Sequence, residues 1–254
     1  MANQLPLNGK SGIVTGASSG IGEATAIHLA GMGANLALAD LDQEGLEAVA
    51  QKIISIGRAE PLIKNTDISI ENQVSELVQA SIERLGAIDF LVNSAGIIRR
   101  TPFLKIDTRE WDQVISINLR GQYFLCRDVI PHMQTRGQGV IVNVASLAGR
   151  TCSVLGGAHY TTAKHALVGF TRHLAREFAP CGIRVNSFCP GATLTPMTKN
   201  STTQEEIDHI AAVTPRGQWA DPMEQAHVIG FLVSEASVNI VGACIDSNGG
   251  ALMI

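Results

Sequence analysis

Short hydrophobic runs alternate with longer amphipathic segments along almost the whole chain. Several runs, such as Ile88–Val92 and Val140–Val144, are nearly continuous in apolar residues, which is typical of strands covered on both faces. The pattern predicts seven strands, at Ser11–Thr15, Asn35–Ala39, Pro61–Asn65, Ile88–Val92, Gly139–Val144, Ile183–Phe188 and Ala243–Asp246. It predicts helices between them, at Asp42–Ser55, Ile70–Leu85, Arg109–Met133, Ala158–Phe178 and Met223–Ser234.

This alternation of strands and helices predicts an α/β fold, with a parallel sheet that has helices on both faces. No linker, repeat or low-complexity tract interrupts residues 1–254, so we expect a single domain. The least regular segment, at about 190–217, is rich in Thr, Pro and Gly and contains a short predicted helix near Gln204–Ala212. A long excursion of this kind, late in an α/β chain, predicts a lid over a substrate site.

Composition and charge narrow the class of protein. The 254 residues carry 19 Lys and Arg against 23 Asp and Glu, a formal net charge of −4, which favours neither nucleic acid nor an anionic membrane as partner. The five cysteines are scattered without a C-x-x-C pair, and no His-Glu-x-x-His is present, so we expect no disulfide framework and no metal. Met1–Lys10 does not resemble a signal peptide and no apolar run approaches the roughly 20 residues of a membrane span, so we expect a cytoplasmic protein.

The 25 glycines exceed what turns require at the usual frequency of about 7%. Three of them lie in Thr15–Gly22, between the first predicted strand and a helix. Gly16 can turn the chain sharply, Gly20 can let backbone approach a pyrophosphate, and Gly22 can allow close helix packing. The spacing is G-x-x-x-G-x-G, which differs from the G-x-G-x-x-G fingerprint of dinucleotide-binding proteins, so the loop by itself is a weak signal.

Asp40 stands at the end of the second predicted strand. A carboxylate there can hold both hydroxyls of an adenosine ribose, as in NAD. A 2′-phosphate would be repelled by it by roughly 4 kcal/mol, at about 4 Å and an effective dielectric constant near 20. Ser18, Ser19 and Leu41 supply no compensating positive charge. The sequence therefore predicts NAD rather than NADP.

Tyr160 and Lys164 are four residues apart in a predicted helix, so their side chains share one helix face. A phenol with a pKa of about 10 is a poor base near neutral pH, but a neighbouring ammonium group favours the phenolate. Such a tyrosine can exchange a proton with a hydroxyl or carbonyl oxygen while a hydride moves to or from a nicotinamide. Ser146, at the end of an earlier predicted strand, is expected on the same side of the sheet.

These residues occur in order with Asn93–Gly96, Asn118 and Pro190-Gly191 over nearly the whole chain. Together they resemble a classical short-chain dehydrogenase/reductase, a family with a Rossmann-type, doubly wound parallel sheet. The resemblance implies that Tyr160 is the catalytic acid and base and that Ser146 binds the reacting oxygen. It also implies that Lys164 holds the nicotinamide ribose and lowers the pKa of the tyrosine, and that Asn118 supports a water in a proton relay.

The resemblance further implies a set of residues along the NAD cofactor. They are Gly16, Ser18, Ser19, Gly20, Ile21, Gly22, Asp40, Asp67, Ile68, Asn93, Ala95, Gly96, Tyr160, Lys164, Pro190, Gly191, Thr193 and Thr195. Ser94 and Ala145 depart from residues that are common in the family, and Thr193 replaces a branched aliphatic residue. None of these departures removes a catalytic group.

The substrate is harder to predict. Gly96–Pro102 and Trp111–Val114 are similar to segments of gluconate 5-dehydrogenases and 2-deoxygluconate 3-dehydrogenases. Arg99 or Arg100 could therefore pair with the carboxylate of a sugar acid, or either could be a solvated or subunit-interface residue. His159 could reach substrate, or it could orient Tyr160 or pack in the core.

The prediction is an NAD-dependent enzyme that interconverts a secondary alcohol and a ketone, with a sugar acid or another polar hydroxy compound as substrate. One alternative is a carbonyl or 3-oxoacyl reductase, although such enzymes usually use NADPH and carry a basic residue in the glycine loop. The other is a non-catalytic dinucleotide sensor, which would need none of Ser146, Tyr160 and Lys164. The apolar tail Ala251–Ile254 is expected to be buried across a subunit contact, and the family resemblance implies a homotetramer.

Overall fold

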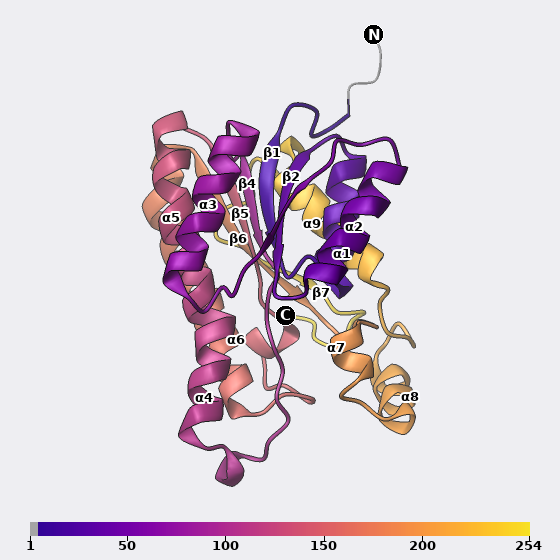
Figure 1. Cartoon of the computed structure of the whole chain (residues 1–254). Helices are drawn as coiled ribbons and strands as arrows, with labels where there is room; N and C mark the ends of the chain where they lie inside the picture. Colours follow the sequence, from indigo (N-terminus) through magenta and orange to yellow (C-terminus); the bar gives the residue numbers. More distant parts are fainter. Residues whose placement is uncertain (1–4) are drawn as a thin grey trace.

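The computed structural model describes residues 5–254, so Met1–Gln4 of the stretch considered for a signal peptide lie outside it. Within residues 5–254, seven strands form one parallel sheet in the order β3-β2-β1-β4-β5-β6-β7 (Figure 1). The strands are β1 (Ser11–Thr15), β2 (Asn35–Asp40), β3 (Leu62–Asn65), β4 (Phe90–Asn93), β5 (Gly139–Val144), β6 (Ile183–Pro190) and β7 (Cys244–Ser247). The predicted doubly wound α/β fold is confirmed.

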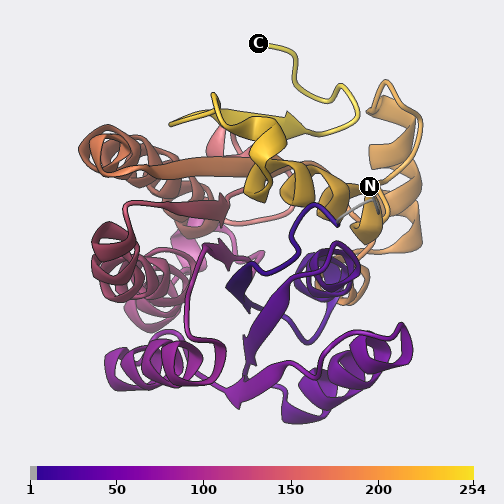
Figure 2. The same ribbon diagram turned by 90° about the horizontal axis from the view of Figure 1, so that it is seen from above.

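Helices cover both faces of the sheet (Figure 2). One face is covered by α1 (Gly20–Gly31), α2 (Gln43–Ser55) and α9 (Pro222–Val233). The other face is covered by α3 (Glu71–Leu85), α5 (Gly121–Arg136) and α6 (Ala158–Phe178). Three shorter helices, α4 (Thr108–Ile115), α7 (Pro196–Lys199) and α8 (Gln204–Val213), lie towards the end of the molecule at which the strands finish (Figure 1).

The two-sided covering explains the continuous hydrophobic runs of the sequence. Ile13 and Leu91 pack with the cluster under α3 and α5, whereas their neighbours Val14 and Val92 pack with the cluster under α1 and α9. All four side chains are fully buried. Because successive strand residues point to opposite faces, both must be apolar when both faces are covered.

The predicted helix Arg109–Met133 is wrong as a single element. It is divided into α4, a π-helical turn at Ser116–Arg120, and α5. Asn118, in this turn, donates its side-chain amide to the carbonyl oxygen of Val114 at 3.0 Å, four residues earlier. A regular α-helix would pair that carbonyl with the backbone N–H of Asn118, so the side chain substitutes for the helical bond. The other predicted boundaries differ from the observed ones by two residues or fewer.

The sheet changes its winding direction between β1 and β4. From β1 the chain moves outwards to β2 and β3, and it then returns to β4 on the other side of β1. Loops that leave these two strands separate in opposite directions, which opens a crevice at the carboxyl ends of the strands. Ligands of doubly wound sheets bind in such crevices, and the candidate site lies here.

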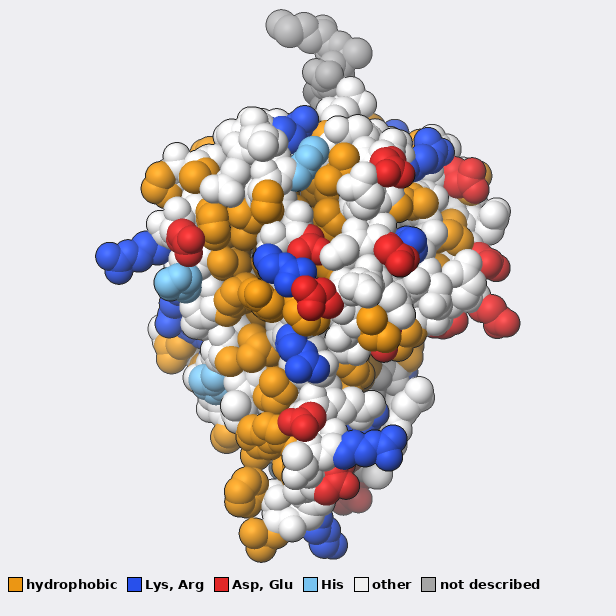
Figure 3. All heavy atoms as spheres, turned by 60° about the vertical axis from the view of Figure 1, so that its left-hand side comes forward, with side chains coloured by type: hydrophobic (Ala, Val, Ile, Leu, Met, Phe, Trp, Pro, Cys, Tyr) orange, Lys and Arg blue, Asp and Glu red, His pale blue; other side chains and the backbone are white. Residues whose placement is uncertain are grey.

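The surface over the α5 and α6 face carries many hydrophobic side chains (Figure 3). Tyr123 of α5 is 42% exposed, and Leu104, in the 3₁₀ turn Phe103–Lys105 before α4, is 93% exposed. No helix among the described residues is both long and apolar enough to cross a membrane. From residue 5 onwards, no cluster of three or more His, Cys, Asp and Glu side chains could hold a metal ion.

Candidate active site

A cleft of about 910 Å³ opens at the carboxyl edge of the sheet. Its walls come from the loop between β1 and α1, the end of β2, the loops after β3, β4, β5 and β6, and helices α6, α7 and α8. A cleft of this size suits a cofactor together with a small substrate.

The glycine loop forms one end of the cleft and leaves no room for a side chain at Gly16 or Gly22. Gly16 and Gly20 have positive φ angles of 65° and 57°, which favour glycine. A Cβ on Gly16 would lie 2.7 Å from the Cα of Ala95, and one on Gly22 would overlap the carbonyl oxygen of Gly16. Ser19 precedes α1 without capping it through its side chain, so the first N–H groups of the helix remain available to an anion. The loop therefore fits a pyrophosphate.

Asp40 is held in place beside this loop. Its two carboxylate oxygens accept hydrogen bonds from the backbone N–H groups of Ser18 and Asp42, both at 3.2 Å. Along the next wall, Asp67 accepts two hydrogen bonds from Ser69, at 2.9 Å from the backbone and 2.6 Å from the hydroxyl. Among the described residues that line the cleft, Lys164 is the only lysine or arginine. No basic side chain of the cleft wall therefore stands beside Asp40.

Ser146, Tyr160 and Lys164 come together in the middle of the cleft, from the end of β5 and the first turns of α6. Lys164 is 4% exposed and donates its ammonium to the carbonyl oxygen of Val144 at 2.9 Å. Its Nζ lies 5.8 Å from the centre of the Tyr160 ring. Burial lowers the pKa of Lys164 to about 8. Burial also raises the pKa of Tyr160, while its hydrogen bond with Ser146 acts in the opposite direction and is weaker.

Asn118 fastens the loop that follows β4. Its side-chain oxygen accepts from the backbone N–H of Ile97 at 3.2 Å, and its amide donates to the carbonyl of Ile97 at 2.9 Å. A Cβ on Gly96 would lie 2.7 Å from this oxygen and 3.6 Å from Nζ of Lys164. The loop can therefore pass close to Lys164 only with glycine at position 96.

The structure places every predicted catalytic and cofactor residue except Asn93 on the wall of the cleft. Asn93 is fully buried beneath the floor and donates its side-chain amide to Asn143 at 2.8 Å. Of the three candidate substrate residues, none lines the cleft: Arg99 and Arg100 lie outside it, and His159 is fully buried.

His159 is bonded at both ring nitrogens. Its Nδ1 accepts from the backbone N–H of Tyr160 at 2.8 Å, so the proton of the neutral ring is on Nε2, which lies 2.8 Å from Oε1 of Glu110. Glu110 is on α4, and its second oxygen accepts from Thr101 at 3.0 Å. These contacts fasten the start of α6, and with it Tyr160, to α4.

The sequence predicts a lid at 190–217, but it does not indicate which residues of that segment line the far wall of the cleft. Glu205, Glu206 and His209 of α8 line the cleft there, together with apolar side chains that include Val154 and Val213. Thr203 and Glu206 form a capping box at the start of α8, and the T-x-x-E spacing is a recognisable signal for that role. The same spacing says nothing of what else the carboxylate of Glu206 contacts.

A dinucleotide cradle beside a serine, tyrosine and lysine on a parallel sheet is the arrangement of a nicotinamide-dependent oxidoreductase. Residues 16–251 match a family model described as enoyl-(acyl carrier protein) reductase. The chain belongs to the short-chain dehydrogenase/reductase family, whose members use nicotinamide dinucleotides and act on secondary alcohols and ketones.

Individual relatives cover nearly the whole chain. Levodione reductase of Leifsonia aquatica is 37% identical over 247 residues, which is 94% of this chain and 92% of the relative. The 3-oxoacyl-[acyl-carrier-protein] reductase FabG of Thermotoga maritima is 34% identical over 98% of this chain and its own full length. A crystal structure of levodione reductase superposes with a TM-score of 0.92 at 36% identity, covering 96% of this chain and 98% of the other. An Agrobacterium tumefaciens structure, provisionally named a gluconate dehydrogenase, gives 0.92 at 32% identity over 99% of both chains.

Proposed function

We propose that this chain is an NAD(H)-dependent oxidoreductase that interconverts a secondary alcohol and a ketone by hydride transfer. The convergence of Ser146, Tyr160 and Lys164 in a cleft that begins at the glycine loop is the observation that supports this most. When bound, the nicotinamide dinucleotide accepts or donates the hydride. The N-terminus of α1 and the glycine loop would hold its pyrophosphate, Asp40 its adenosine ribose, and the wall at Asp67 and Ile68 its adenine.

Tyr160 is the acid and base of the proposed reaction. In the reducing direction its hydroxyl donates a proton to the carbonyl oxygen, and in the oxidising direction its phenolate removes the proton of the alcohol. Ser146 hydrogen-bonds with the same oxygen and orients it towards the tyrosine. Burial alone raises the pKa of Tyr160, so the nearby ammonium group of Lys164 is needed to favour the phenolate. Asn118 holds the loop beside these groups and supports the water of the proton relay.

Asp40 supports NAD as the cofactor. A 2′-phosphate beside this carboxylate would be repelled, and no basic side chain of the described cleft wall compensates for it. The wild-type enzyme is expected to favour NADH over NADPH by at least about a hundredfold in kcat/KM, and Asp40→Ala to narrow that ratio by at least about tenfold. Steady-state rates with each cofactor measure both ratios. Asp42→Ala is the matched control, because Asp42 caps α2 and does not line the cleft. A wild-type preference for NADPH would refute the role given to Asp40.

A sugar acid stays a prediction as the substrate, and the position of Arg99 and Arg100 outside the cleft does not support it. A 3-oxoacyl reductase is the second candidate, because the Thermotoga maritima relative of that name matches over its full length. Because such reductases usually use NADPH, the absence of a basic residue beside Asp40 in the described cleft wall favours an NAD(H)-dependent oxidoreductase of alcohols and ketones over this second candidate.

We also infer that residues 190–217 act as a lid, because α7 and α8 form one wall of the cleft. A homotetramer in the cytoplasm is the proposed working form. Within a single chain Met253 and Ile254 are 75% and 82% exposed, so they are available for the subunit contact expected of the apolar tail.

A further inference from the structure

The substrate end of the cleft, beyond Tyr160, has mostly apolar walls. Ile98 follows β4, Leu147 and Leu155 come from the segment between β5 and α6, and Met197 and Val213 come from α7 and α8. Gly156 packs against the ring of Tyr160, so the segment before α6 lies directly beside this side chain. A substrate that reaches Tyr160 therefore places much of its remaining surface against apolar side chains.

The charges at this end are predominantly negative. Glu205 and Glu206 line the cleft, and His209 is the only nearby group in its described wall that could become positive, apart from Lys164. Lys164 is buried and already donates to the carbonyl of Val144. A substrate carboxylate would lose hydration here without gaining a cation, which is unfavourable.

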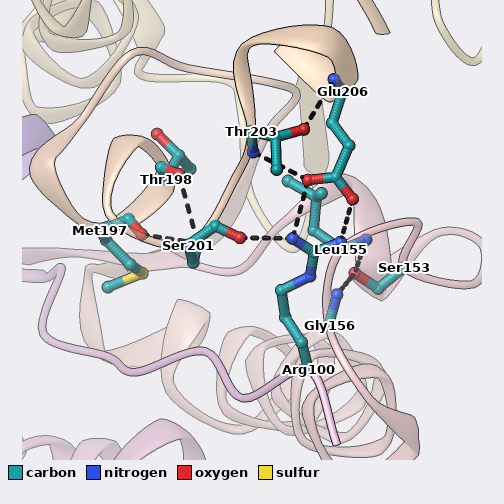
Figure 4. A network of polar contacts seen from close by, with 9 residues as sticks. All are labelled: Arg100, Ser153, Leu155, Gly156, Met197, Thr198, Ser201, Thr203 and Glu206. Atoms are coloured by element: carbon teal, nitrogen blue, oxygen red, sulfur yellow. Dashed lines mark hydrogen bonds and ion pairs between the residues drawn. The ribbon is translucent and has the colours of Figure 1, made fainter. Parts of the chain in front are cut away.

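Arg100 is the side chain that could change this balance, and Glu206 engages it (Figure 4). The guanidinium forms two hydrogen bonds to the two carboxylate oxygens, at 3.0 and 2.5 Å, and it also donates to the carbonyl oxygen of Ser201. Glu206 keeps its capping bond with the backbone N–H of Thr203 at 2.9 Å. Arg100 and Thr203 hold the pKa of Glu206 at about 2, so its carboxylate is ionised throughout the neutral range.

This ion pair joins the loop after β4 to α8. The two segments belong to different walls of the cleft, and the bidentate geometry orients Arg100 towards Glu206 and Ser201. An anionic substrate could pair with Arg100 only if Arg100 first separated from the ionised carboxylate of Glu206, which is fixed in the cap of α8.

On the basis of the proposed function, we propose that the enzyme selects uncharged, apolar ketones and secondary alcohols and excludes anionic ones. Because the guanidinium of Arg100 is paired with Glu206, it is not available to a substrate carboxylate, and this excludes anionic substrates. Arg100 is therefore a specificity-determining residue that acts through its partner on α8.

The test compares matched pairs of ketones. One pair is a cyclohexanone that carries a methyl group or a carboxylate at the same ring carbon, and the other is a linear methyl ketone that ends in a methyl group or a carboxylate. Consumption of NADH gives kcat/KM for each. The wild-type enzyme is expected to favour the neutral member by at least about a hundredfold. Glu206→Gln, which releases Arg100, is expected to narrow this ratio by about tenfold through a lower KM for the carboxylate.

Glu224→Gln is the matched control. Glu224 is also the third residue of a helix cap, formed with Asp221, and also makes a bidentate pair with an arginine, Arg216, but this pair lies outside the cleft. Glu224→Gln should leave the ratio of kcat/KM between the neutral and the carboxylate ketone unchanged. The double variant Arg100→Gln with Glu206→Gln should return to the wild-type ratio, because it lacks the arginine that Glu206→Gln releases. Equal wild-type efficiency on both members, or the same ratio in Glu206→Gln and Glu224→Gln, would overturn the inference while leaving the proposed function intact. If NADH binds but neither member of any pair is reduced, the proposed function itself fails.

Discussion

Lys164 is a buried lysine, and its burial is unfavourable for the charged form of its side chain. The residue is 4% exposed, and its ammonium group donates one hydrogen bond, to the carbonyl oxygen of Val144. No hydrogen bond or ion pair within residues 5–254 joins it to a carboxylate. Burial lowers its pKa from 10.5 to about 8, so the folded protein disfavours the charged form that the proposed mechanism requires. The proposed catalytic role of Lys164 therefore comes at the expense of stability.

This cost predicts a pH dependence of stability. Between pH 8 and 10 the unfolded chain keeps the proton of Lys164 and the folded chain releases it, so the free energy of unfolding rises with pH. Relative to Lys164→Met, the wild-type protein should gain about 2 kcal/mol over this range. Denaturant unfolding of both proteins without cofactor measures the difference. The raised pKa of Tyr160 acts in the opposite direction only near and above its unfolded value of about 10. If the difference in free energy of unfolding between the wild-type protein and Lys164→Met stays constant from pH 8 to 10, the lowered pKa of Lys164 is contradicted.

At the same scale, the spacing of Tyr160 and Lys164 and the position of Ser146 after a strand were sufficient to predict the central group of the cleft. His159 could not be assigned in the same way. Its two partners are the adjacent backbone N–H of Tyr160 and Glu110, which is 49 residues away. The second contact exists only because α4 and α6 pack together, and nothing local to His159 indicates it.

Among the elements, α6 carries two residues of the proposed reaction, Tyr160 and Lys164. The bond between His159 and Glu110 fixes its first turn to α4, while most of the helix packs against the sheet. Because catalytic geometry tolerates little displacement, Glu110→Ala is expected to lower kcat by about tenfold and to leave KM for NADH within about twofold.

Glu177→Ala is the control for this prediction, since Glu177 pairs with His173 on the exposed surface of the same helix. It should change neither constant. Steady-state kinetics with varied NADH separates the two effects. An equal loss in both variants, or a change in KM alone, would show that the contact stabilises the helix without positioning Tyr160.

Strands and most helices were predictable because hydrophobic periodicity reports burial directly. The π-helical turn at Asn118 was not, since the residues around it continue a helical pattern. What breaks the α-helix is a side-chain bond from Asn118 to Val114, together with bonds to Ile97 in a distant loop. Irregular backbone of this kind is decided by tertiary contacts and is frequently found at functional sites.

For the molecule as a whole, the parallel sheet with helices on both faces follows from the alternation of strands and helices, whereas the order of the strands is seen only in the structure. The composition of the cleft wall opposite the cofactor site cannot be predicted from this alternation. Arg100 and Glu206 are 106 residues apart, and nothing in the local pattern around either residue indicates that they pair with each other. Only the folded arrangement shows that they join two walls of one cleft.

The exposed apolar side chains of the isolated chain give a prediction at this scale. Light scattering should find a mass of about four times 26.9 kDa for the purified protein. Met253→Ser with Ile254→Ser should shift it to a smaller species, because these side chains are 75% and 82% exposed within one chain. Ile56→Ser, at an exposed apolar position after α2, should leave the mass unchanged. A monomeric wild-type protein would contradict the proposed tetramer.

The central claim is that Tyr160 transfers the proton that accompanies hydride transfer from NADH. The most direct measurement is the rate of NADH-dependent ketone reduction by the wild-type enzyme and by Tyr160→Phe, together with the dissociation constant of NADH for each from fluorescence titration. The rate is predicted to fall by at least about a hundredfold in Tyr160→Phe, while the dissociation constant stays within about twofold. A variant that binds NADH and reduces the ketone at a rate close to that of the wild-type enzyme would contradict the account.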